Sequence, residues 1–313
     1  MTADIDASTA PLDHRLELAQ AVYLERCAPG YRTRRVRWSG GSTQVIELGE
    51  GPALLLVHGG MGEALQYGSI LPLLARRYRV IAVDRPGNGL ADPFDYRGVD
   101  MLAHARRFLS ELIDAEGLSS VPIVASSMGG LWSIVFAIES PERVPRLVLL
   151  GAPAGIRRKV PLQIRLGTLP ILKTLVRSMM TSPTRDSTLA FWSQLMVAHP
   201  ERLDVDLLDA LTASQSRNAS SWFSLIDSTI DVGGMKPELM IGERWKKLSV
   251  PTTLILGEND AWCPLEEGEA IVLSNPHVQV VRKVVRIPSA GHAAWLDDPG
   301  RVVDAINKAL IEI

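Results

Sequence analysis

Three side chains in this sequence could together break a bond to a carbonyl carbon: Ser127, Asp260 and His292. A serine hydroxyl is a weak nucleophile at neutral pH unless a base lies within hydrogen-bond reach. Histidine can be that base, and a carboxylate beside it holds the imidazole in the useful tautomer. The sequence therefore predicts acyl transfer by a serine nucleophile, provided that the fold brings these distant residues together.

Ser127 lies in a small-x-Ser-x-small pattern, with Ala125 and Gly129 at the two tight positions. Such a pattern places the serine on a strained turn between a strand and a helix. The flanking residues must be small because the turn brings the backbone close to its neighbours. Centring the pattern on Ser126 would put larger side chains at those positions. Ala125 departs mildly from the usual glycine, and a serine here could instead simply cap a helix.

The candidate acid and base follow Ser127 in the order acid, then histidine, which occurs in serine hydrolases built on a parallel sheet. Asp260 comes shortly after one apolar run, and His292 comes after the last run. Glu258 is the local competitor for the role of the acid. The apolar run that ends at Leu150 is followed by no carboxylate, so the main alternative position for the acid is empty.

Two backbone N–H groups are expected to stabilise the oxyanion. One belongs to Met128, the residue after the nucleophile, and the other to the glycine-rich loop 58–62. Met61 is the first choice for this second donor and Gly60 is the alternative. His58 is interpreted as a structural residue that holds the loop.

These residues must be positioned by a sheet, and short apolar runs predict its strands. The runs cover residues 53–57, 79–83, 121–125, 144–150, 252–256 and 278–287. Runs that are apolar on both faces are typical of buried parallel strands. Helical spacing of apolar residues separates them at 100–116, 131–138 and 302–311. Two further strands are expected around 34–38 and 43–47, so the fold class is α/β.

The alternation of strands and helices divides the chain into three parts. A tail and short helix are expected over residues 1–31, and the core over 32–155 and 248–313. Residues 156–247 contain no clean buried strand and predict a helical cap, a name kept below for this segment. Trp192 and Trp222 of the cap, with Trp262, are candidate substrate-binding residues, although packing is the commoner role for such side chains.

Composition excludes several classes of protein. The net charge of −2 over 313 residues gives no support for nucleic acid or an anionic membrane as partner. The histidines have no metal-binding spacing, so neither a metal nor a cofactor is expected. Two cysteines and an acidic N-terminus without an apolar run predict a soluble cytoplasmic protein. The expected partner is a small hydrophobic substrate, and a homodimer is one option for assembly.

Five segments together carry a family resemblance. They are His58-Gly59-Gly60, Asp84-Arg85-Pro86-Gly87-Asn88-Gly89, Ser127-Met128-Gly129-Gly130, Gly257-x-x-Asp260 and Gly291-His292. In these segments the chain resembles the α/β-hydrolase superfamily, from about residue 32 to the end. The resemblance implies a mostly parallel eight-stranded sheet flanked by helices, with the cap inserted between the sixth and seventh strands.

Within the superfamily, the sequence is similar to esterases, cofactor-free haloperoxidase-like enzymes and C–C bond hydrolases, and the loop 58–64 resembles the last group most. Members that use an aspartate nucleophile are disfavoured by Ser127. The predicted function is hydrolysis of a carboxylic ester or related acyl bond of a small hydrophobic substrate. The alternatives are a C–C bond hydrolase or lyase with the same three residues, and a non-catalytic ligand receptor.

Overall fold

The computed structural model describes residues 11–273 and 282–311. Its centre is an eight-stranded sheet in the order β1-β2-β4-β3-β5-β6-β9-β10. The strands are β1 (Arg32–Trp38), β2 (Gly41–Leu48), β3 (Ala53–Val57), β4 (Arg79–Val83), β5 (Ile123–Ser126), β6 (Leu147–Leu150), β9 (Thr252–Gly257) and β10 (Arg282–Ile287). Strand β2 runs antiparallel to β1 and β4, and the other pairs are parallel. The predicted fold class is confirmed.

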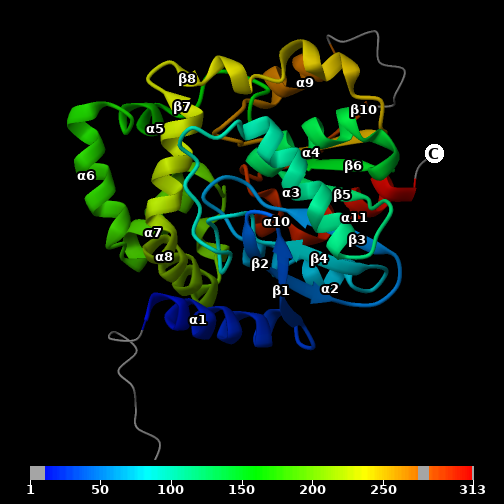
Figure 1. Ribbon diagram of the computed structural model, residues 1–313, viewed down its shortest axis with the longest axis horizontal. Helices are drawn as coiled ribbons and strands as arrows, with labels where there is room; N and C mark the ends of the chain where they lie inside the picture. Colours follow the sequence, from blue (N-terminus) through cyan, green and yellow to red (C-terminus); the bar gives the residue numbers. More distant parts are fainter. Residues whose placement is uncertain (1–10, 274–281, 312–313) are drawn as a thin grey trace, which may run out of the picture.

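Helices cover both faces of this sheet (Figure 1). The core-covering helices are α2 (Leu71–Leu74), α3 (Met101–Ala115), α4 (Ser127–Glu139), α9 (Leu265–Leu273), α10 (Ala294–Asp297) and α11 (Pro299–Ile311). Side chains alternate along β3: Leu55 and Val57 pack with α3 and α4, whereas Leu54 and Leu56 pack with α2 and α11. Burial on both faces explains why the strands are apolar throughout.

The cap lies between β6 and β9, to the left of the sheet in Figure 1. Its regular elements are α5 (Leu162–Leu166), α6 (Pro170–Thr181), α7 (Arg185–Leu195), α8 (Val205–Thr229), β7 (Ile230–Asp231) and β8 (Gly234–Met235). The two-residue strands β7 and β8 pair with each other and were not expected from the sequence. They are too short to give an apolar run.

The N-terminal helix α1 (Leu12–Cys27) packs along α8 of the cap. Arg26 pairs with Asp204, which directly precedes α8, and with Asp206 in the first turn of α8. The buried Gln20 of α1 donates a hydrogen bond to Glu63 at 3.0 Å. The short helix that the sequence predicted therefore links the cap to the core.

Several element boundaries differ from the predictions. Strand β5 begins at Ile123 and β6 at Leu147, so both are shorter than the apolar runs that predicted them. Helix α4 begins at Ser127, four residues before the apolar stretch that predicted it. The first part of the predicted strand 278–287 and most of the predicted tail lie outside the described residues.

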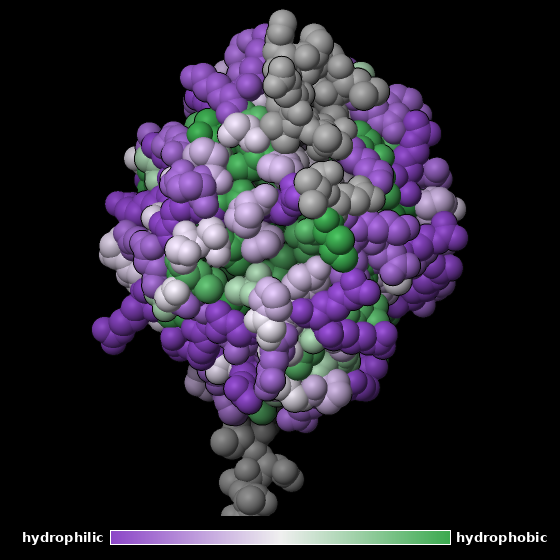
Figure 2. Space-filling view, turned by 90° about the vertical axis from the view of Figure 1, so that its right-hand side faces the viewer, coloured by the Kyte–Doolittle hydropathy of each residue, from purple (hydrophilic) through white to green (hydrophobic). Residues whose placement is uncertain are grey.

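Figure 2 shows the face that lies on the right of Figure 1, away from the cap. Hydrophilic side chains surround and interrupt the apolar ones on this face. None of the described helices combines the length and apolarity that a bilayer crossing needs.

The remaining short segments are 3-10 turns, namely η1 (Ala64–Tyr67), η2 (Pro141–Arg143), η3 (Pro200–Arg202), η4 (Pro237–Leu239) and η5 (Gly242–Lys247). The first of these follows the glycine-rich loop and is fully buried, so it fixes where that loop ends.

Candidate active site

Ser127 lies where β5 ends and α4 begins, with a positive φ of 48°. A non-glycine residue in this region of backbone space costs about 1–3 kcal/mol and is held by its surroundings. The surroundings are tight: a Cβ on Gly129 would collide with the carbonyl oxygens of Val57 and His58. A Cβ on Gly59 would lie 3.0 Å from the Ser127 Cβ. Gly129 of the pattern and Gly59 of the facing loop are therefore steric requirements of the turn.

Asp260 and His292 form a buried hydrogen-bonded pair, with 2.8 Å between Asp260 Oδ2 and His292 Nδ1. The other carboxylate oxygen accepts the N–H groups of Trp262 at 2.8 Å and Cys263 at 3.2 Å. A carboxylate held in this way requires the hydrogen of the imidazole on Nδ1. The Nε2 atom of His292 is buried without a protein partner, and the ring lines the same pocket as Ser127.

The turn after β6 supports this pair without supplying a carboxylate. Gly151 has a φ of +67°, and a Cβ there would lie 2.8 Å from the carbonyl oxygen of His292. The next N–H group, of Ala152, points to Asp260 Oδ2 at 3.4 Å. This turn contains no acidic side chain, and its backbone instead packs against the loops of Asp260 and His292.

Asp297 is a positioning residue that the sequence analysis missed. Its carboxylate accepts the N–H of Gly291, directly before the histidine, at 2.7 Å. It also accepts the N–H groups of Ala198 at 3.0 Å and His199 at 2.8 Å, from the segment between α7 and α8. These donors lie up to 99 residues from Asp297 in the chain, so no local pattern could have revealed it.

The glycine-rich loop after β3 is held by His58 and Arg85. His58 Nδ1 donates to the carbonyl of Gly59 at 2.7 Å, and Nε2 accepts the N–H of Arg85 at 2.8 Å. The buried guanidinium donates to the carbonyls of His58 and Gly59 and lies over the ring of Trp132. Burial lowers the pKa of His58 well below its usual value, so the ring is neutral. His58 is thus committed to the loop and faces no substrate.

The two predicted oxyanion donors both border the pocket. Met128 is in the first turn of α4, where backbone N–H groups have no acceptor within the helix. Met61 has a φ of +49°, which bends the loop sharply beside Gly60. Gly60 also lines the pocket, so both candidates for the second donor border it.

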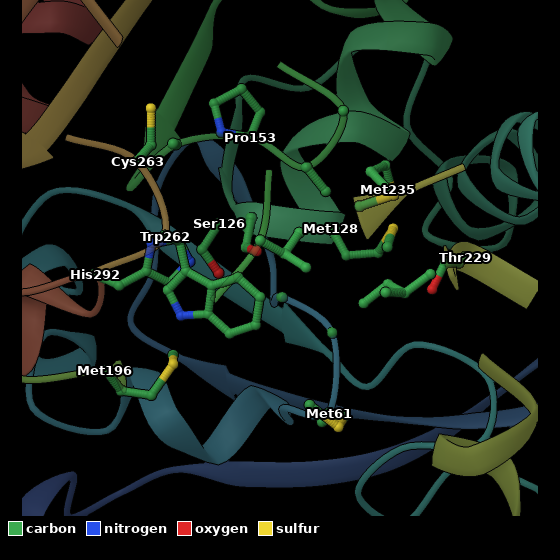
Figure 3. Close-up of a pocket in the computed structure, with 18 of the residues that line it drawn as sticks. Met61, Ser126, Met128, Pro153, Met196, Thr229, Met235, Trp262, Cys263 and His292 are labelled. Atoms are coloured by element: carbon green, nitrogen blue, oxygen red, sulfur yellow. The ribbon is translucent and has the colours of Figure 1, made fainter. Parts of the chain in front are cut away.

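The pocket beside Ser127 is mostly apolar and has a volume of about 80 Å³. Figure 3 shows Trp262 and His292 adjacent on one side, with Thr229 and Met235 on the other. The rings of Trp262 and His292 are 5.6 Å apart. Trp295 also borders the pocket and is packed against Tyr67. A hydrophobic substrate would suit these walls.

The structure places the three predicted substrate-binding tryptophans differently. Trp192 and Trp262 line the pocket beside Ser127. Trp222 instead lines a neighbouring cavity within the cap. Across the described residues, His, Cys, Asp and Glu side chains form no group of three or more that could hold a metal ion.

Comparison with known sequences identifies relatives of this chain. The profile of the alpha/beta hydrolase family matches residues 54–305. The chain is 29% identical over 245 residues to 2-hydroxy-6-oxononadienedioate/2-hydroxy-6-oxononatrienedioate hydrolase 1 of Dechloromonas aromatica, covering 77% of this chain and 78% of the relative. It is 26% identical over 286 residues to 2-hydroxy-6-oxo-6-phenylhexa-2,4-dienoate hydrolase of Burkholderia cepacia, covering 85% and 88%.

Solved structures share the fold. Carboxylesterase CesB of Bacillus subtilis is similar with a TM-score of 0.75 and 19% identity, over 96% of this chain and 98% of that one. A serine hydrolase involved in carbazole degradation gives a TM-score of 0.71 at 24% identity, over 90% and 99%. The resemblance inferred from the motifs is confirmed. Since the family profile extends over both parts of the core and the cap between them, this chain belongs to the alpha/beta hydrolase family.

Proposed function

We propose that this hydrolase cleaves a carboxylic ester or related acyl bond of a small hydrophobic substrate, with Ser127 as the nucleophile. The observation that carries the proposal is the state of His292. Its Nδ1 is fixed by Asp260, and its Nε2 is buried without a partner in the pocket that Ser127 borders. An imidazole with one nitrogen anchored and the other free is suited to accept a proton.

The reaction then has two halves. His292 Nε2 takes the proton of the Ser127 hydroxyl while the oxygen attacks the carbonyl carbon, and the N–H groups of Met61 and Met128 stabilise the oxyanion. The imidazolium returns its proton to the leaving alcohol, and an acyl-enzyme remains. Water then attacks this ester with His292 again as the base, which releases the carboxylic acid and restores Ser127.

A C–C bond hydrolase is the second candidate function. The curated relatives are named as hydrolases of 2-hydroxy-6-oxo-dienoates, which carry a carboxylate. Lys159 and Arg157 border the pocket beside Ser127, and Arg157 already pairs with Glu267 at 3.1 Å. Lysine in particular could bind a substrate carboxylate. In this reaction the carbon leaving group, rather than an alcohol, receives the proton from His292.

Replacement of Ser127 tests both candidates. The Ser127→Ala variant should lose on the order of 10⁶ in kcat on its substrate, since a missing nucleophile cannot be replaced locally. The matched control is Ser126→Ala, because Ser126 is adjacent, borders the same pocket and contacts Tyr67 instead. The substrates are p-nitrophenyl butyrate and a vinylogous ring-fission diketone, and the preferred one identifies the bond.

Covalent labelling separates catalysis from mere binding. A fluorophosphonate should label the wild-type chain at Ser127, and His292→Ala should abolish the labelling because the hydroxyl would lose its base. Full turnover by Ser127→Ala on every substrate would exclude this nucleophile. Absence of labelling and turnover in the folded wild-type protein would favour a ligand receptor.

A further inference from the structure

The loop that carries Met61 is held at its start by buried side chains. His58 and Arg85 bind the carbonyl groups there, as described above. Met61 itself has a φ of +49°, a strained backbone conformation that persists only where its surroundings hold it. Whatever holds the other end of the loop therefore affects the direction of the Met61 N–H.

That other end is held by Glu63, whose side chain is completely buried. Its Oε2 atom accepts a hydrogen bond from Nε2 of Gln20 in α1 at 3.0 Å. The N–H group of the next residue, Ala64, donates to Oδ1 of Asp84 at 2.7 Å. Because Glu63 is only two residues from Met61, a displacement of its side chain would also displace the backbone of the candidate oxyanion donor.

The second carboxyl oxygen of Glu63, Oε1, is buried without a hydrogen-bond partner. A carboxylate in this position would be a buried charge without compensation, which is far more costly than a buried neutral carboxyl group. Burial, followed by the charge of Asp84, accordingly raises the pKa of Glu63 to about 8. The side chain is therefore mostly uncharged at pH 7.

The charged groups around Glu63 do not offset an ionised form. Asp84, after β4, repels a second negative charge, and Arg217 of α8 attracts it. Arg217, however, is already bonded to Asp13 at 2.6 Å and to two backbone carbonyls. Among the residues that the structure describes, none forms an ion pair with Glu63. Ionisation would leave a buried charge that a movement of the loop toward water would relieve.

We propose that uncharged Glu63 is a positioning residue for the reaction, and that its hydrogen bond with Gln20 holds the loop so that the N–H of Met61 faces the oxyanion. The proposal rests on the proposed function, since Glu63 acts through a donor assigned there. It adds α1, which lies outside the sheet and the cap, to the elements that hold the active site.

Matched substitutions of buried polar side chains test this assignment. Glu63→Leu removes the hydrogen bond with Gln20 at similar volume, whereas Glu63→Gln keeps an acceptor that cannot ionise. The control is Gln44→Leu. Gln44 is buried too, but it donates to Gln20 at 3.2 Å rather than to Glu63. Thermal unfolding verifies that each variant is folded.

The variants are first compared on p-nitrophenyl butyrate at pH 7. Glu63→Leu should lower kcat about 10- to 100-fold and change KM less than about threefold, because a displaced donor affects the transition state more than the bound ester. Glu63→Gln and Gln44→Leu should each keep kcat within about threefold. Equal losses in Glu63→Leu and Gln44→Leu, or no loss in a folded Glu63→Leu, would overturn the proposal.

The pH profile is a readout that a merely structural role would not move. Wild-type kcat should fall about fivefold or more between pH 7.5 and 9.5, as Glu63 ionises. Glu63→Gln should keep its kcat over the same range, after correction for spontaneous hydrolysis of the ester. This comparison holds even if Glu63→Leu does not fold. The same decline in both proteins would contradict the positioning role.

Hydrogen exchange separates this proposal from the function itself. In a Ser127→Ala background, the amides of residues 59–64 should exchange at least about tenfold faster with Glu63→Leu than with Gln44→Leu. Faster exchange in a protein whose wild type turns over no ester would reject the ester function and retain the hold of Glu63 on the loop. Unchanged exchange would reject the positioning role, whatever the turnover.

Discussion

The core and the cap of this hydrolase differ in how firmly their residues are held. Leu54 and Leu56 of β3 are completely buried between two layers of helices. Helix α6 of the cap has no fully buried residue, and its Ile171 is 90% exposed. From this contrast we expect the core to fix the candidate reacting groups and the cap to select the substrate.

The contacts around the active site show the same difference. Asp260 accepts two backbone N–H groups, and Gly291, directly before His292, donates its N–H to Asp297, so both loops have little freedom of movement. Helices α6 and α7 are tied to α8 by exposed ion pairs such as Arg185–Asp209, and such pairs contribute at most about 1 kcal/mol. Substitutions in the core should therefore lower stability and activity strongly, and substitutions in the outer cap should change them little.

The largest effect is expected from the acid. Asp260→Asn should lower kcat on the order of 10⁴-fold, because an amide facing His292 favours the wrong tautomer. Steady-state kinetics on the best ester measures this loss, and thermal unfolding verifies that the fold persists. Retention of most activity would transfer the role of the acid to Glu258, the competitor in the sequence.

Glu63, which accepts a hydrogen bond from Gln20 of α1, should make the stability of the protein depend on pH. It is fully buried, and desolvation together with Asp84 raises its pKa to about 8. The unfolded chain loses this proton near its ordinary pKa of about 4.5, so stability should fall as pH rises between these two values.

A neutral amide removes that dependence. Glu63→Gln keeps a partner for Gln20 and should be more stable than wild type at pH 8, by on the order of 4 kcal/mol, with a much smaller gain at pH 5. Urea unfolding at the two pH values measures the difference. The same difference at both pH values would show that Glu63 is ionised in the folded protein.

A third effect concerns the turn at Ser127. Gly129→Ala should destabilise the fold by about 1–3 kcal/mol or more, because the new methyl group would collide with two carbonyl oxygens. The matched change in the cap is Gly167→Ala, where the nearest atom would be 3.3 Å away. Urea unfolding should find that this control changes stability much less. Equal losses would contradict the contrast in packing.

The smallest effect is expected at the surface of α6. Ile171→Ser should change the free energy of unfolding by less than about 0.5 kcal/mol and leave the turnover of p-nitrophenyl butyrate unaltered. Leu112→Ala, in the buried face of α3, should cost about 2–5 kcal/mol. Parallel urea titrations compare the two. A large loss from the surface change would mean that α6 is covered by something in solution.

Much of the core could be predicted from the sequence because its requirements are local. Apolar runs identified the sheet, since a strand buried on both faces tolerates only apolar side chains. The small residues around Ser127 indicated the turn, since any Cβ on Gly129 meets neighbouring backbone. Asp260 and His292 do lie together, whereas their catalytic roles and those of Ser127 stay predictions for the experiments above.

What the sequence could not determine depends on distant segments meeting. Asp297 gathers donors from two parts of the chain, and Arg85 holds a loop that precedes it by more than twenty residues. The apolar space within the cap is bounded by residues of α5, α6, α7 and α8, and its volume depends on how these helices pack. Residue types record what each position requires of its immediate neighbours, but the space left between helices exists only in the tertiary structure.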